Sequence, residues 1–266
     1  MAEVTETGAD WQPGVVEGEE RLSVAGGRLP RVTRKTPSRT APKWESDARE
    51  RVRGAIRKYS RPLSDLIKRD ANEGDTRLIV TDFLCEALGY DKYEDLTTEY
   101  RIRGEFADYG LRIDKQLVAF LEVKRCTTKL NAKHLRQVEM YAVNEGVEWM
   151  ILTNGQVWQI WHLTAGLPVS VDLALEIDLL GEESASVKAD GLFYLAKESF
   201  KRRQIDELWR AKAATSPAVL GSVVLSEAVL DEIRKELRRR TTHNVGVKDL
   251  RDLLERSVLR PDVFES

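Results

Sequence analysis

Cysteine is scarce in this sequence of 266 residues, with Cys85 and Cys126 as its two examples. Two cysteines cannot build a disulfide framework, and these lack the C-x-x-C spacing of a structural zinc site. Because Cys85 follows Phe83 and Leu84 in an apolar run, we expect a reduced thiol in the core.

Long apolar runs are also missing. No segment approaches the roughly 20 apolar residues that a membrane span needs, and the mean hydropathy is -0.41. The sequence begins with acidic residues and lacks the charged and then apolar layout of a signal peptide. These features predict a cytoplasmic protein.

A strong net charge is absent as well, since the formal charge is -2 at pH 7. The average hides an asymmetry: residues 1–20 carry six acids and no bases, whereas residues 21–70 carry fifteen Lys or Arg against five acids. Net charge therefore does not exclude a DNA-binding face. The sequence also has no G-x-x-x-x-G-K-[ST] motif, so we expect no ATP motor in it.

Three regions follow from composition and periodicity. Residues 1–44 are rich in Gly, Pro, Thr and Arg and predict a disordered arm. Residues 45–180 predict an α/β domain, and residues 181–266 a charged, helical C-terminal region.

Within the α/β domain we expect the order α-β-β-β-α-β-β. The first helix starts near Glu45, and Pro62 is expected to begin its second part. The other expected helices and strands are 73–88, 96–103, 105–113, 116–124, 132–144, 148–153, 156–162 and 168–180. Turns are expected at Asp114-Lys115 and at Asn154-Gly155.

Two carboxylates and an ammonium are predicted to meet in this domain. A hairpin that turns at Asp114-Lys115 brings Asp108 back beside Glu122. Glu122 and Lys124 are two residues apart on a strand, so both side chains leave the same face. Such a group suits phosphodiester hydrolysis, because hard oxygen ligands hold Mg²⁺ and a lysine can stabilise developing charge.

A plainer interpretation of the same residues stays open. In a chain that is 32% charged, an Asp followed by Glu-x-Lys arises often by chance, and the pair could simply end a strand in solvent. Trp149, Trp158 and Trp161 alternate with apolar residues, which favours core packing over base stacking. His134 is expected at the surface.

Four motifs occur in an order that resembles the PD-(D/E)XK nuclease superfamily, in particular the N-terminal nuclease domain of type I restriction enzyme R subunits. They are E-x-x-T-R at residues 73–77, Ala107-Asp108 in place of "PD", Glu122-Val123-Lys124 as E-x-K, and Q-x-x-x-Y at residues 137–141. The similarity runs from about Asn72 to Leu163.

The resemblance implies a restriction-endonuclease-like core, with a central mixed sheet flanked by helices. It implies that Asp108, Glu122 and the carbonyl of Val123 hold Mg²⁺, with Mn²⁺ as a substitute, that Lys124 is catalytic, and that Glu73 is a supporting acid. The candidate nucleic-acid contacts are Arg77, Arg125, Lys133, Arg136, Gln137 and Tyr141.

We therefore expect a metal-dependent endonuclease that cleaves DNA in restriction or DNA processing. The alternative is a catalytically inactive nuclease-fold module that binds nucleic acid or a partner protein. A separate motor or specificity subunit is a candidate partner, and a homodimer is compatible with the sequence.

Overall fold

The computed structural model describes residues 41–102, 105–166 and 168–260. The expected disordered arm, residues 1–44, lies outside the described residues except for its last four positions. No helix in the described ranges combines the length and apolar character that crossing a bilayer requires.

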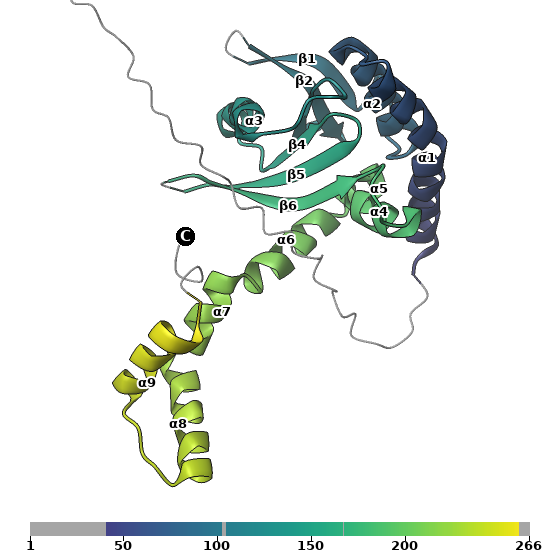
Figure 1. Ribbon diagram of the computed structural model, residues 1–266. Helices are drawn as coiled ribbons and strands as arrows, with labels where there is room; N and C mark the ends of the chain where they lie inside the picture. The colour runs from purple at the N-terminus through teal and green to yellow at the C-terminus, as the bar shows by residue number, and fades with distance from the viewer. Residues whose placement is uncertain (1–40, 103–104, 167, 261–266) are drawn as a thin grey trace, which may run out of the picture. The chain divides into compact units, whose positions relative to one another are not determined.

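A single six-stranded sheet forms the centre of the α/β region, with its strands in sequence order (Figure 1). The strands are β1 (Leu96–Ile102), β2 (Glu105–Ile113), β3 (Gln116–Val123), β4 (Trp149–Thr153), β5 (Val157–Thr164) and β6 (Ser170–Asp178). Neighbouring strands are antiparallel except for β3 and β4, which are parallel because a helix connects them. The sheet is therefore mixed, as expected.

Helices cover both faces of the sheet (Figure 1). On one face lie α1 (Lys43–Lys68) and α2 (Glu73–Glu86), whose buried side chains join those of Leu121 and Ile151 in the larger core. On the other lies α3 (Ala132–Glu145), which packs on Phe120 and Met150. Alternate residues of β3 and β4 thus supply two separate cores.

The region after β6 is helical. It consists of α4 (Ala185–Leu192), the 3₁₀ turn η1 (Phe193–Leu195), α5 (Lys197–Lys201), α6 (Gln204–Ala214), α7 (Pro217–Val224), α8 (Glu227–Thr241), α9 (Val247–Leu253) and the π-helical turn η2 (Leu254–Val258). Leu192, Phe200 and Ile205 belong to the same core as α1 and α2, so the first of these helices complete the α/β unit.

The predicted fold class is confirmed, with one local correction. Pro62 does not start a second helix but lies inside the continuous α1. Pro62 is exposed. Because proline has no backbone N–H, one carbonyl of the preceding turn lacks its helical partner, and water can hydrate it at this exposed position. The Ser60 and Ser64 hydroxyls also donate to the carbonyls of Ile56 and Ser60, at 2.6 and 2.8 Å, on the same stretch of helix.

Both predicted turns form. Asp114 and Lys115 have φ values of 50° and 68°, as a two-residue hairpin turn with the twist of its strands requires. Gly155 has φ of 83° in the β4–β5 turn. Trp149 and Trp158 are buried, and both cysteines are free thiols, Cys126 buried and Cys85 half-buried.

Two glycines provide a matched test of this backbone. Gly155→Ala should destabilise the protein by about 1–3 kcal/mol, because alanine is strained at positive φ and its Cβ would lie 3.1 Å from Leu63 Cδ1. Gly54→Ala, on the exposed side of α1 with nothing within 4 Å of the new Cβ, should stabilise it by about 0.5–1 kcal/mol. Urea unfolding measures both, and shifts of the same sign would contradict the structure.

Candidate active site

The β2–β3 hairpin places Asp108 and Glu122 opposite each other. Tyr109 pairs with Leu121 in the antiparallel register, so the next pair toward the open end of the hairpin is Asp108 and Glu122. Side chains of paired residues leave the same face of a sheet. Both are buried, with exposed fractions of 6% for Asp108 and 3% for Glu122.

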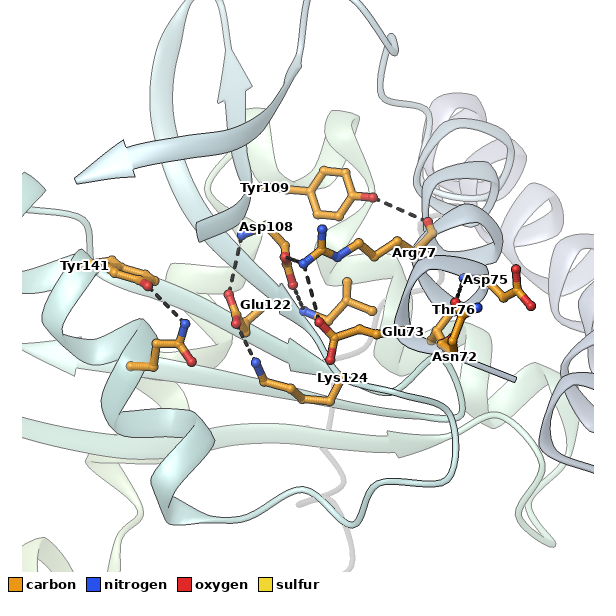
Figure 2. A network of polar contacts seen from close by, with 12 residues as sticks. Asn72, Glu73, Asp75, Thr76, Arg77, Asp108, Tyr109, Glu122, Lys124 and Tyr141 are labelled. Atoms are coloured by element: carbon orange, nitrogen blue, oxygen red, sulfur yellow. Dashed lines mark hydrogen bonds and ion pairs between the residues drawn. The ribbon is translucent and has the colours of Figure 1, made fainter. Parts of the chain in front are cut away.

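Each carboxylate accepts a backbone N–H from the other strand. Asp108 Oδ2 accepts from the amide of Val123 at 2.7 Å, and Glu122 Oε2 accepts from the amide of Asp108 at 3.4 Å (Figure 2). The two carboxylates thus accept N–H groups that backbone carbonyls would accept if the pairing of β2 and β3 continued. These bonds hold both carboxylates in place without any ligand.

Two cations complete the group. Lys124 Nζ donates to Glu122 Oε1 at 2.6 Å, and its side chain is 15% exposed. Arg77 of α2 forms an ion pair with Asp108 through Nη2 and Oδ1 (Figure 2). Asp108, Glu122 and Lys124 therefore lie together at one end of the sheet, as their spacing predicts.

Helix α2 brings Glu73 and Arg77 to the same place. Its N-cap is Asn72, whose side chain accepts from the amide of Asp75 at 2.8 Å, so Glu73 is the first helical residue. Arg77, one turn later, lies 3.4 Å from Glu73 through its Nη2. Asp75 points away and pairs with Arg69 at 3.0 Å.

Thr76 and Arg125 fix α2 against the loop after β3. Thr76 is fully buried, and its hydroxyl accepts from the amide of Cys126 at 3.1 Å. Arg125 donates to the carbonyls of Ala71 and Asp70, at 3.1 and 2.6 Å. The structure thus gives Arg125 a positioning contact, and its expected phosphate contact stays a prediction. The role of Thr76 was not foreseen, although it stands inside E-x-x-T-R.

Helix α3 faces the carboxylates from the other side. Gln137 donates to the Tyr141 hydroxyl at 3.0 Å (Figure 2), and the Tyr141 ring is 1% exposed and packs on Phe120. A buried ring cannot stack on a base without leaving its core. Lys133 and Arg136 are exposed on the same helix, where they can meet a phosphate backbone.

His134 is half-buried on α3 rather than fully at the surface. Burial first, and then the nearby charges of Lys124 and Lys133, lower its pKa from the ordinary value. Its Nδ1 is buried and has no hydrogen-bond partner. The ring is therefore a neutral neighbour of the carboxylate group at neutral pH.

Burial and charge repulsion shape the electrostatics of the pair. Desolvation, followed by the neighbouring Glu122 carboxylate, raises the pKa of Asp108 to about 6, although the Val123 amide and Arg77 oppose this shift. An acid with a raised pKa binds its proton more tightly when the protein is folded. Ionised Asp108 is therefore disfavoured in the folded protein, mainly by its burial.

The residues fit a divalent cation of the Mg²⁺ type. Among the described residues, no three His, Cys, Asp or Glu side chains converge as a metal site. Mg²⁺ is commonly held by one or two carboxylates and keeps several waters. Asp108 and Glu122 would supply those carboxylates and Val123 a carbonyl, and a bound cation would relieve the repulsion that raises the pKa of Asp108.

The raised pKa gives a stability test without metal. Because the folded pKa is above the unfolded value of 3.8, the stability due to neutral Asp108 is present below about pH 4 and lost as the pH rises through about 6. Asp108→Asn, which stays neutral, should therefore be more stable than the parent at pH 8, by about 1–3 kcal/mol. Its advantage should vanish near pH 4.

Urea unfolding in EDTA between pH 4 and pH 8 measures this difference. Asp75→Asn, which changes an acid of α2 that points away from the centre and pairs with Arg69, is the control. The measured quantity is the stability of Asp108→Asn minus that of the parent. If this difference is smaller at pH 8 than at pH 4, the pKa of Asp108 is not raised by folding.

Residues 72–168 match the family model described as the type I restriction enzyme R protein N terminus. No curated protein and no solved structure matches the chain. The matched stretch contains α2, the β2–β3 hairpin and α3, and so every residue of the carboxylate group. Over residues 72–168 the chain therefore resembles the N-terminal domain of type I restriction enzyme R subunits, which confirms the resemblance predicted from its motifs.

Proposed function

We propose that this protein is a metal-dependent nuclease that hydrolyses DNA phosphodiester bonds in restriction or DNA processing. The observation that carries the proposal is the buried pair of facing carboxylates, Asp108 and Glu122, with Lys124 in contact. Burying two carboxylates side by side is costly, and a fold gains little stability from such an arrangement. The family match, at the level of a restriction-related nuclease domain, supports the same function.

Each residue has a task in this reaction. Asp108 and Glu122 would hold the cation, and the backbone amides of Val123 and Asp108 orient their carboxylates. A bound Mg²⁺ lowers the pKa of a water and neutralises charge on the phosphate. Lys124, half-buried beside Glu122, aligns the attacking water and stabilises the charge that develops in the transition state.

A second candidate function has its own supporting observation. All four oxygens of Asp108 and Glu122 already contact protein donors among the described residues. A self-neutralised group of this kind could belong to an inactive module that binds nucleic acid or a partner protein. The two candidates differ in one respect: only the nuclease needs Mg²⁺ for its effect on DNA.

The direct experiment is incubation of the purified protein with plasmid, linear and single-stranded DNA in Mg²⁺, Mn²⁺ or EDTA. We expect cleavage with either metal and none in EDTA. Because type I R subunits work with other subunits, a motor or specificity subunit is included as a proposed partner. Metal-independent DNA binding without cleavage in every condition would favour the inactive module.

Replacing the lysine separates catalysis from binding. Lys124→Ala should lower kcat by about 100-fold or more, about 3 kcal/mol, because its charge acts in the transition state. Metal affinity should hold or rise slightly, since a cation near the site is removed. Cleavage rates and calorimetric Mn²⁺ titration measure the two effects.

The control for this variant is Lys92→Ala, which removes an exposed lysine outside the centre. It should leave both quantities unchanged. If the Lys124→Ala protein cleaves DNA as fast as the parent, the catalytic interpretation of Glu122-Val123-Lys124 is wrong.

DNA binding should depend on the exposed bases of α3. The double variant Lys133→Ala/Arg136→Ala should weaken DNA binding in EDTA several-fold and make it less sensitive to salt, because phosphate contacts release counterions. Fluorescence anisotropy between about 50 and 200 mM salt measures both. Unchanged affinity and salt dependence would place the DNA elsewhere.

A further inference from the structure

Every oxygen of the carboxylate pair already has a protein donor, so a metal ion would have to share these oxygens with their present partners. Asp108 Oδ1 pairs with Arg77, and Asp108 Oδ2 accepts from the Val123 amide. Glu122 Oε1 accepts from Lys124, and Glu122 Oε2 accepts from the Asp108 amide. A carboxylate oxygen can accept a hydrogen bond and bind a metal ion at once, but the positive charges of Arg77 and Lys124 oppose a second cation at these oxygens.

The two backbone amides are the least able to move, because β2 and β3 carry them within the sheet. Lys124 follows directly after β3, its amide bonds to the Thr153 carbonyl at 2.7 Å, and its side chain is 15% exposed. The two amides are therefore part of the sheet itself, and Lys124 is anchored next to it and is less exposed than Arg77.

Arg77 differs in four ways. It comes from α2, outside the sheet, and its side chain is 37% exposed. Its Nε is buried and has no hydrogen-bond partner among the described residues, so its present position leaves a donor unsatisfied. A second acceptor, Glu73 Oε1, lies only 3.4 Å from the same Nη2 (Figure 2).

We propose that Arg77 is an exchangeable counter-ion: it neutralises Asp108 in the metal-free protein and shifts to Glu73 when a divalent cation binds. Glu73 is then a positioning residue that receives Arg77, and it is not a metal ligand. This inference rests on the proposed function, because it concerns the cation that Asp108 and Glu122 would hold. It explains why an acid and a base, one turn apart on α2, both face the carboxylates.

The exchange makes a specific prediction for metal affinity. Arg77→Met removes the competing cation, so Mn²⁺ should bind about three- to tenfold more tightly. Glu73→Gln removes the receiving acid, so Mn²⁺ should bind about threefold or more weakly. In an Arg77→Met background the Glu73→Gln change should have a much smaller effect, because no guanidinium remains to be received.

The experiment is calorimetric Mn²⁺ titration of the parent, both single variants and the double variant at pH 8, where Asp108 is ionised in all of them. Arg69→Met is the matched control, since it breaks the Arg69–Asp75 pair near the same helix without touching the carboxylates. It should leave the affinity unchanged. Thermal melts check folding, and Arg77→Gln replaces Arg77→Met if the latter does not fold.

Three results would overturn the exchange. Equal or weaker metal binding by Arg77→Met and Arg77→Gln would show that Arg77 does not compete. A Glu73→Gln loss of equal size with and without Arg77 would assign Glu73 to the metal. If the parent binds no Mn²⁺, both the proposed function and this inference are wrong. If the parent binds Mn²⁺ tightly but either of the first two results is found, only the inference is wrong.

Discussion

The reciprocal hydrogen bonds of the Asp108 and Glu122 side chains with the amides of Val123 and Asp108 are the contacts on which the rest of the centre depends. Strand pairing stops there, and the two carboxylates occupy the positions that carbonyls would take in a continued ladder. Because the donors are backbone groups, the carboxylates are held by the sheet itself. Their separation is fixed before any cation or substrate arrives.

Helix α2 is placed by the same part of the chain. The buried Thr76 hydroxyl accepts from the Cys126 amide just beyond β3, and Arg125 holds the carbonyls before the helix. The α2 helix that carries Glu73 and Arg77 is therefore held in a fixed position relative to the carboxylates. The neighbouring negative charge and the burial that raise the pKa of Asp108 are consequences of this geometry. Such a centre costs the folded protein stability, which is common where a site is built for a ligand.

Local sequence signals were enough to predict the hairpin and the grouping of Asp108, Glu122 and Lys124. Two positive-φ residues at 114 and 115 fix where the chain reverses, and counting back from them brings position 108 within one residue of 122. The shift of register between Leu111 and Arg112, which moves the pairing by one residue, was not predicted. The order of strands and helices followed from periodicity in the same way. The helices α4, α5 and α7 were not separated, since they are short and carry weak periodic patterns.

Contacts between distant segments could not be predicted from the sequence. The ion pair of Arg77 with Asp108 depends on how α2 docks on the sheet, and the burial of Tyr141 depends on how closely α3 packs on Phe120. Spacing places Gln137 and Tyr141 on one helix face but does not tell how deep that face lies. Pro62 was misjudged for a related reason, because only the packed helix shows that its own side is exposed.

The central claim is that Asp108 and Glu122 hold one divalent cation. Crystals soaked in Mn²⁺ and measured for anomalous scattering test it most directly, since manganese can substitute for magnesium at oxygen sites. The account predicts one strong peak per chain, about 2.0–2.3 Å from carboxylate oxygens of both residues. A peak bound elsewhere, or none at Mn²⁺ concentrations that support cleavage, would contradict it.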